Sequence, residues 1–211
     1  MKKMTKLYFV RHGKTEWNLS RKLQGGQADS PLLEDSLIEA QLLGEQLKEV
    51  AFGQVFVSTQ LRAVKTCEML LSEFVEAPGV TYVDGLKEFG LGTLEGQTIE
   101  EAIDAFPEQM HHLRNNAHEY NPIEFQGETY QALIDRSLAV VHEAMENYPE
   151  QNLLFISHGV TLVAVIQTLL GKPLSDIREA GGLDNTSLSV IEVTPLEMKL
   201  ILWNDKSHLT S

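Results

Sequence analysis

An arginine, a histidine and a glycine stand directly behind a short apolar run near the start of the chain. The run is Leu7 to Val10 (LYFV), and Arg11, His12 and Gly13 follow it. A chain that leaves a strand usually turns through glycine, asparagine or aspartate, so a cation beside an imidazole suggests chemistry rather than a turn. We therefore take Arg11 and His12 as candidate functional residues.

Similar side chains follow two other apolar runs. Arg62 lies four residues after the run 55–58 (VFVS), and His158 directly follows the run 153–157 (LLFIS). In open α/β sheets, ligands bind outside the carboxyl ends of the strands. The sequence thus predicts that two arginines and two histidines meet at one edge of a sheet.

This combination suits a phosphoryl group. A guanidinium holds phosphate oxygens in a bidentate fork, and a neutral histidine between such cations can attack phosphorus to form a phosphohistidine. We also expect a helix to open at Thr15 to Asn18, with N–H groups that favour an anion. Because the arginines can stabilise the charge, this chemistry requires no metal.

An alkoxide leaving group also requires a general acid, and the segment after the run 80–83 (VTYV) offers two. Glu88 and Glu95 both lie in LKEFGLGTLEG, residues 86–96. We favour Glu88, because it lies closer to the strand end, whereas Glu95 and Gly96 precede a helix capping box and suit a turn.

Strands and helices alternate along the chain. Two further apolar runs, 187–193 and 198–203, predict a final pair of strands joined as a hairpin. Apolar residues at helical spacing predict helices within 37–50, 61–71, 99–106, 130–145 and 160–170. In the second of these, the expected buried face contains Leu61, Val64, Cys67 and Leu71. A largely parallel sheet with helices on both faces and at least one antiparallel strand follows.

The segment 107–128 departs from this alternation. It is polar and contains His111, His112 and His118. Zinc ligands on one helix require a spacing of about three to five residues, which these histidines lack. We expect this segment to form a lid over the substrate rather than a metal site.

Composition narrows the class of protein. The 211 residues, 43% of them hydrophobic, predict a single domain over 1–211, and no apolar run is long enough to cross a membrane. The net charge of −13 argues against nucleic acid or an anionic membrane as a partner. The single cysteine, Cys67, and the absence of a signal-peptide pattern predict a cytoplasmic location.

Four motifs together resemble the histidine phosphatase superfamily, the phosphoglycerate-mutase-like group, over nearly the whole chain. In order, they are RHGKTEWN (11–18), STQLRAVKT (58–66), LKEFGLGTLEG (86–96) and SHG (157–159). The resemblance implies a three-layer α/β/α sandwich with a mostly parallel six-stranded sheet and no cofactor. One family pattern is altered, because Leu33 and Ser36 stand where the family often has threonine and glycine.

The resemblance also implies roles for the site residues. His12 is expected to be the phosphorylated nucleophile and Glu88 the proton donor and acceptor. The remaining members of the expected pocket are Arg11, Asn18, Arg62 and His158, and Gln24 is a further candidate for its lining. As a residue at the sheet edge, Arg62 is expected to contribute little to folding.

These features leave three functions to compare. The first is a phosphatase acting on a small phosphorylated metabolite, and the second is a cofactor-dependent phosphoglycerate mutase. The resemblance implies that mutases of this family are longer chains with an added basic substrate segment. In this chain, residues 88–113 contain no lysine or arginine. The third, a non-catalytic phosphoryl-binding module, would be expected to lack His12 or the acid, yet both are present. We therefore expect metal-independent hydrolysis of a small phosphomonoester through a phosphohistidine.

Overall fold

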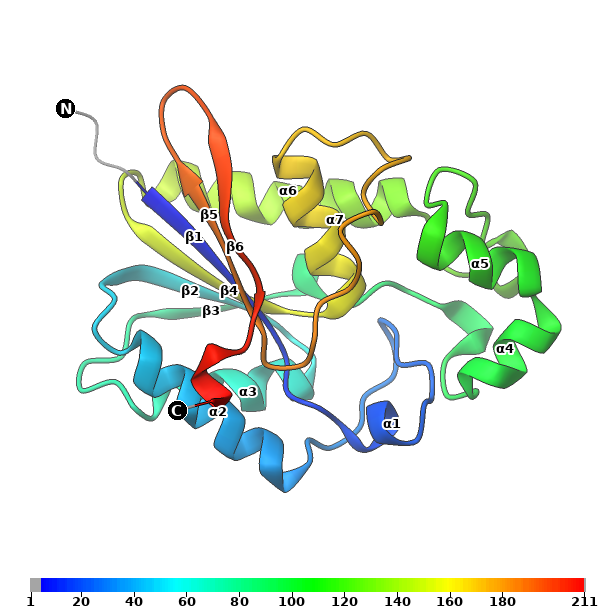
Figure 1. The fold of residues 1–211 in the computed structure, drawn as a ribbon, viewed down its shortest axis with the longest axis horizontal. Helices are drawn as coiled ribbons and strands as arrows, with labels where there is room; N and C mark the ends of the chain where they lie inside the picture. Colours follow the sequence, from blue (N-terminus) through cyan, green and yellow to red (C-terminus); the bar gives the residue numbers. More distant parts are fainter. Residues whose placement is uncertain (1–4, 211) are drawn as a thin grey trace.

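Six strands form one twisted sheet in the computed structural model, which describes residues 5–210 (Figure 1). The strand order is β3-β2-β4-β1-β5-β6. Their bounds are β1 Thr5–Arg11, β2 Phe52–Ser58, β3 Val80–Val83, β4 Asn152–Ser157, β5 Leu188–Val193 and β6 Met198–Asp205. The first four strands of this order pair in parallel, whereas β5 runs antiparallel to both of its neighbours. The predicted mostly parallel, six-stranded sheet with one antiparallel strand is confirmed.

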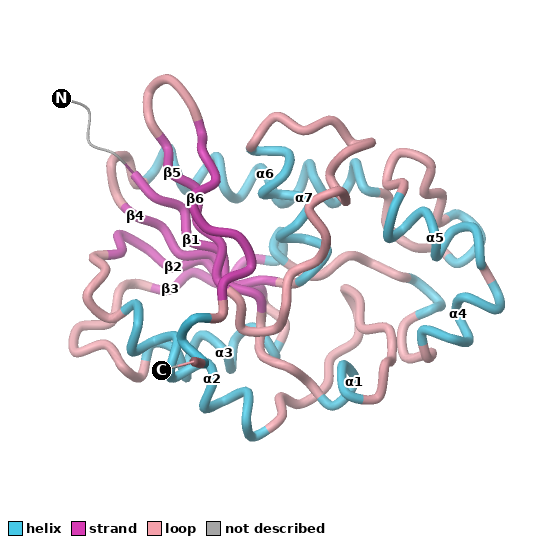
Figure 2. Tube along the Cα trace, viewed as in Figure 1, coloured by secondary structure: helices cyan, strands magenta, loops and turns pink. Residues whose placement is uncertain are grey.

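Helices cover both faces of this sheet. Their bounds are α1 Glu16–Leu19, α2 Glu34–Leu47, α3 Leu61–Leu71, α4 Ile99–Ala105, α5 Pro107–Asn115, α6 Tyr130–Asn147 and α7 Gly159–Leu169. Figures 1 and 2 show α2 and α3 on one face and α6 and α7 on the other, which is the predicted three-layer sandwich. Among residues 5–210, no helix combines the length and hydropathy that a bilayer crossing requires.

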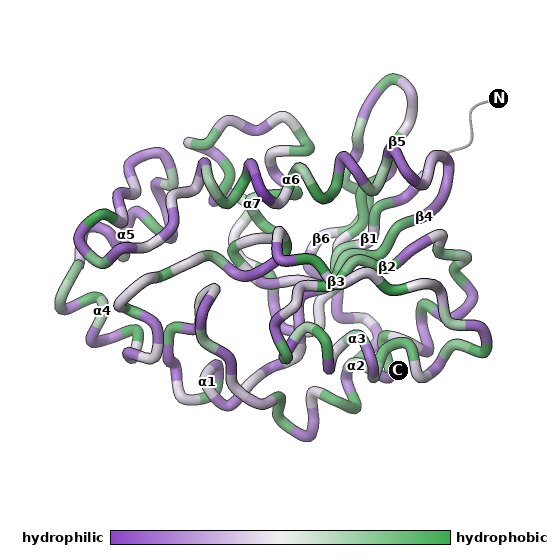
Figure 3. The backbone as a smooth tube through the Cα atoms, turned by 180° about the vertical axis from the view of Figure 1, so that it is seen from behind, coloured by the Kyte–Doolittle hydropathy of each residue, from purple (hydrophilic) through white to green (hydrophobic). Residues whose placement is uncertain are grey.

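Alternate residues of the strands supply two separate cores, because successive side chains of a strand point to opposite faces. On β1, Phe9 packs in the cluster with α6 and α7, whereas Val10 packs in the cluster with α2 and α3. Figure 3 shows the strands at the centre of the sheet as its most hydrophobic part. Residues at the carboxyl ends of these strands therefore stand on a rigid support.

The buried face of α3 differs from the expected one. Leu61 is 65% exposed, whereas the buried residues are Arg62, Ala63, Thr66, Cys67 and Leu70. The buried face of α3 is rotated relative to the expected one, because the first turn of the helix directs polar side chains toward the sheet edge rather than into the apolar core.

At the start of α2, Leu33 occupies the cap position and makes no side-chain capping bond. This is a consequence of leucine standing where the family often has threonine, because leucine has no oxygen to accept from the first N–H groups.

The segment 107–128 contains a helix that its polar composition did not predict. Helix α5 begins at Pro107, and Met110, Tyr120 and Phe125 are buried in a third cluster with Phe89. Figure 1 shows α4 and α5 beyond the carboxyl end of the sheet rather than over its faces. The segment thus packs through a core that it shares with the rest of the domain, and its action as a lid stays a prediction.

Close packing of α2 on α3 gives a test of this architecture. A Cβ atom on Gly44 would lie 2.1 Å from the main-chain oxygen of Leu70. Alanine favours a helix by about 1 kcal/mol over glycine, but overpacking costs about 1–3 kcal/mol or more when backbone must move. We expect Gly44→Ala to lower the free energy of unfolding in urea, whereas the exposed control Gln46→Ala leaves it within about 0.5 kcal/mol. A more stable Gly44→Ala variant would contradict the close helix contact.

Candidate active site

The carboxyl ends of β1 and β4 bring the two predicted histidines together. Arg11, the last residue of β1, pairs with Ser157, the last residue of β4. His12 and His158 come next in the chain, and their ring centroids lie 5.1 Å apart. The predicted meeting of these side chains at one sheet edge is what the structure shows.

His12 is held as a neutral ring with one free lone pair. It is 3% exposed, and its Nδ1 lies 2.7 Å from the main-chain oxygen of Gly13. Since a carbonyl can only accept, Nδ1 carries the hydrogen and the lone pair is left on Nε2. Burial, assisted by the charges of Arg62 and Arg11, holds the pKa of His12 well below 6.5. A neutral ring with its lone pair on Nε2 is the form of histidine that can attack an electrophile.

His158 has both ring nitrogens engaged by the protein. Arg62 donates from Nε to Nδ1 at 3.1 Å, so Nε2 carries the hydrogen and donates to the Ser58 hydroxyl at 2.7 Å. Burial, followed by the charge of Arg62, holds the pKa of His158 well below 6.5. In this arrangement His158 orients Arg62 beside His12.

Arg62 is a buried residue, so the expectation that it contributes little to folding is wrong. It is 1% exposed. Its five N–H donors reach acceptors at 2.8 to 3.2 Å on His158, Ala28, Asp29, Gly25 and Gln60. A buried guanidinium must be satisfied in this way, and Arg62 thereby fixes the loop 25–29 against the site.

Arg11, by contrast, keeps hydrogen-bonding capacity. Its Nη1 donates to the main-chain oxygen of Leu183, but its buried Nε has no acceptor among residues 5–210. A Cβ on Gly159 would lie 3.2 Å from this Nε, so glycine allows the guanidinium to lie against the start of α7. An anion that reaches this Nε would supply the missing acceptor.

The predicted helix at Thr15 to Asn18 is present as α1, but its N–H groups do not face an anion. The main-chain nitrogen of Trp17 donates to the Ser30 hydroxyl, and that of Asn18 donates to the Thr15 hydroxyl. The expectation of an anion site at this helix start is therefore wrong.

Asn18 and Gln24 have different partners in the site. The Asn18 oxygen accepts from the Thr15 main-chain nitrogen and from Asn185, whereas its amide nitrogen makes no hydrogen bond to residues 5–210. With its amide oriented to satisfy its neighbours, Gln24 accepts from Arg62 Nη1 at 3.0 Å. Asn18 thus retains a free donor, whereas Gln24 belongs to the network around Arg62.

The two candidate acids have different surroundings. Glu88 is 8% exposed, and its carboxylate accepts from the main-chain nitrogens of Phe89, Val160 and Thr161 at 2.8 to 3.2 Å. It therefore lies at the first turn of α7, next to His158, and its charge acts on both Arg11 and Arg62.

Glu95 instead holds the loop in place. Its carboxylate accepts from the main-chain nitrogens of Gln27, Ala28 and Leu91 at 2.7 to 3.2 Å. Of the two acids, Glu88 is the one whose carboxylate lies at the start of α7, which directly follows His158.

Three polar residues of the site were not predicted from the sequence. Asp29 pairs with Arg62 at 3.0 Å, Gln60 joins Arg62 to the loop, and Asn185 donates to the main-chain oxygen of His12 at 3.0 Å. The other site residues were selected because they are charged or imidazole side chains that follow the end of a strand. None of these three residues meets that criterion.

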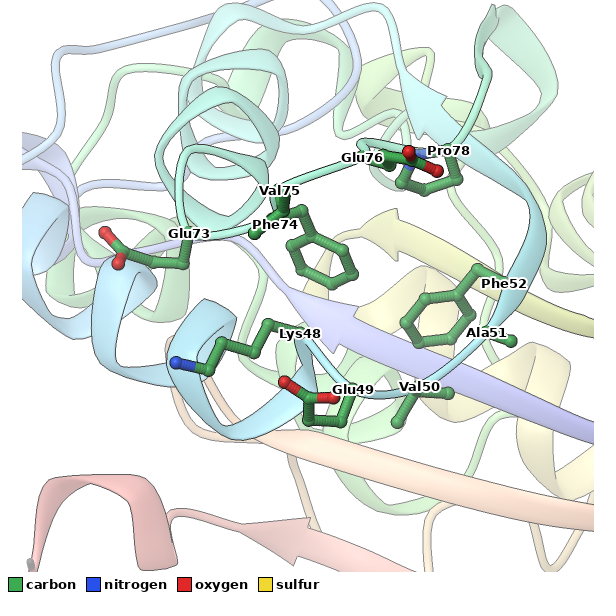
Figure 4. Close-up of a pocket in the computed structure, with 10 residues that line it drawn as sticks. All are labelled: Lys48, Glu49, Val50, Ala51, Phe52, Glu73, Phe74, Val75, Glu76 and Pro78. Atoms are coloured by element: carbon green, nitrogen blue, oxygen red, sulfur yellow. The ribbon is translucent and has the colours of Figure 1, made fainter.

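Two features outside this site, a cavity near β2 and a pair of histidines, do not indicate a second reactive centre. A cavity of about 510 Å³, shown in Figure 4, lies at the amino end of β2 between Phe52 and Phe74, far from the strand ends that carry the site. His112 and His118 both face Glu119, and no cluster of three or more possible metal ligands occurs within 5–210.

The two neutral histidines predict how stability depends on pH. In the unfolded chain each titrates near pH 6.5, so below that pH the unfolded state binds more protons. Stability is therefore intact above pH 6.5 and falls as the pH drops toward the lowered pKa values, by up to about 1.4 kcal/mol per pH unit for each histidine.

We expect the free energy of unfolding to fall less between about pH 7.5 and about pH 5.5 in the double variant His12→Gln, His158→Gln than in the wild type. Urea unfolding at both pH values measures this difference. The same loss in both proteins would show that these histidines titrate normally in the folded state.

Known proteins are similar to this chain in sequence and in fold. A family model of the histidine phosphatase superfamily (branch 1) matches residues 7–206. The chain is 29% identical to the uncharacterized phosphatase PhoE of Bacillus subtilis, with 98% of both chains covered. It is 30% identical to the probable phosphoglycerate mutase GpmB of Salmonella paratyphi A, covering 98% of this chain and 95% of that protein. Among solved structures, Bacillus stearothermophilus YhfR matches with a TM-score of 0.89 at 30% identity, covering 97% of this chain and 99% of YhfR. The chain belongs to the histidine phosphatase superfamily, as its four motifs predicted.

Proposed function

We propose that this enzyme hydrolyses a small-molecule phosphomonoester through a phosphohistidine at His12, without a metal ion. Its family makes it a phosphoric monoester hydrolase or a phosphoglycerate mutase-like enzyme. The observation that carries the proposal is a neutral His12, with hydrogen on Nδ1, close enough to Arg11 to feel its charge, while the buried Nε of Arg11 has no acceptor among residues 5–210.

In the first step, Nε2 of His12 attacks phosphorus as the bond to the leaving oxygen breaks, and Glu88 gives that oxygen a proton. In the second step, Glu88 takes a proton from water, whose oxygen attacks phosphorus and releases His12. The guanidinium of Arg11 and the amide of Asn18 supply donors to the phosphoryl oxygens, which stabilises the charge of the transition state.

The lack of lysine and arginine in residues 88–113 favours hydrolysis over mutase activity. A mutase must hold a bisphosphate, but residues 88–113 contain no lysine or arginine and include Glu100, Glu101, Asp104 and Glu108. A small, singly phosphorylated metabolite is therefore the proposed substrate class. The cytoplasmic location, which rests on the single cysteine, stays a prediction.

Covalent trapping tests the proposed nucleophile. Acid-quenched enzyme that has turned over p-nitrophenyl phosphate in the presence of EDTA is expected to carry one phosphoryl group on the peptide with His12. The variant His12→Ala should lack both this adduct and turnover, because no other residue supplies the attacking lone pair. Undiminished turnover in His12→Ala, or a stable adduct elsewhere, would rule out the mechanism.

The leaving group distinguishes the two candidate acids. The alkoxide of glycerol 3-phosphate is strongly basic and needs a proton, whereas p-nitrophenolate departs without one. In single-turnover formation of the phosphoenzyme, Glu88→Gln should slow the alkyl ester by at least about 100-fold, and the aryl ester far less. Glu95→Gln is the matched variant and should show no such selectivity. Selective loss in Glu95→Gln would transfer the role of acid to that residue.

A further inference from the structure

Gln60 occupies an unusual place for a glutamine. It caps the start of α3 by its backbone, yet its side chain makes no capping bond, and it is 7% exposed. The Leu61 N–H at the start of α3 donates to the carboxylate of Asp29 and not to the Gln60 side chain. The amide of Gln60 is thus free to serve another purpose than starting the helix.

All four hydrogen-bonding positions of this amide are used. Its oxygen accepts from the Glu88 main-chain nitrogen at 2.8 Å and from Arg62 Nη2 at 3.2 Å. Its nitrogen donates to the main-chain oxygens of Gly25 at 2.9 Å and Ala28 at 3.2 Å. The orientation of the amide is fixed, because the first two partners only donate and the last two only accept.

The four partners do not depend equally on Gln60. The oxygens of Gly25 and Ala28 also accept from Arg62. The Glu88 N–H, however, has the Gln60 oxygen as its acceptor among residues 5–210, and the Glu88 carbonyl is held separately by Arg136. Loss of the Gln60 amide therefore removes the acceptor of the Glu88 N–H and one of the five acceptors of Arg62, which keeps the other four.

We propose that Gln60 is a positioning residue that sets the Glu88 carboxylate relative to Arg62 and His12. This inference rests on the proposed function, in which Glu88 is the proton donor. A displaced Glu88 peptide turns its carboxylate away from the leaving oxygen, while His12 and its attack on phosphorus are unaffected. Gln60 thereby acts on proton transfer through another residue and not on the phosphoryl group itself.

Single-turnover formation of the phosphoenzyme from glycerol 3-phosphate and from p-nitrophenyl phosphate separates positioning from general structural support. In Gln60→Met, which keeps the length of the side chain without its amide, the alkyl rate should fall about tenfold or more and the aryl rate less than about threefold. The control Gln54→Met removes a comparable bond, to Thr81 at 2.8 Å, on the exposed part of β2 and should change neither rate.

The variant Gln60→Glu supplies a second reading, because its carboxyl group keeps an oxygen to accept from the Glu88 N–H and, when protonated, has a hydroxyl to donate to the Gly25 oxygen in place of the lost amide N–H. It should retain an alkyl-to-aryl rate ratio close to that of the wild type, and it decides the question if Gln60→Met does not fold. Equal losses for the two esters in Gln60→Met, or loss of the ratio in Gln60→Glu, would overturn the positioning role. Failure of the wild type to form phosphoenzyme would instead refute the proposed function.

Discussion

The burial of the Arg62 guanidinium is the constraint on which the rest of the site depends. A cation that is 1% exposed requires an acceptor for every N–H group. The loop 25–29 provides three of these acceptors, Gln60 a fourth and His158 the fifth. Because Arg62 can only donate, His158 must present a bare nitrogen to it. The buried charge of Arg62 thus fixes the loop 25–29 and holds His158 as a neutral ring of one tautomer.

The same charge shapes the chemistry of His12. An imidazolium between Arg62 and Arg11 would add a third positive charge to a site from which water is largely excluded, so the neutral ring is favoured. The chain as a whole carries a net charge of −13, yet locally Asp29 and Glu88 balance the guanidiniums. Reactivity here follows from a few oriented groups and not from the overall charge.

The sequence alone predicted the layers of the fold and most of the strand-end residues, because hydrophobic periodicity and position after a strand both report on the backbone. Its failures involve polar residues that face inward. The buried face of α3 was assigned from the spacing of its apolar residues. In the structure, however, the polar residues Arg62 and Thr66 are buried, whereas the apolar residue Leu61 is exposed. The N–H groups at α1 were assigned to an anion because partners such as Ser30, brought near by the loop, cannot be seen in a local pattern. Gln60 was missed for the same reason, since only the fold shows what its amide meets.

His12 is held neutral, with hydrogen on Nδ1 and a lone pair on Nε2. Nitrogen-15 NMR of histidine-labelled protein, with His12 assigned by comparison with His12→Gln, measures this directly. We expect the Nε2 resonance to stay at the unprotonated position as the pH falls through the ordinary histidine pKa of 6.5, because burial and the two guanidiniums lower the pKa of His12. Titration of His12 with a midpoint near 6.5, or hydrogen on Nε2 in place of Nδ1, would show that the site does not hold His12 as this neutral tautomer.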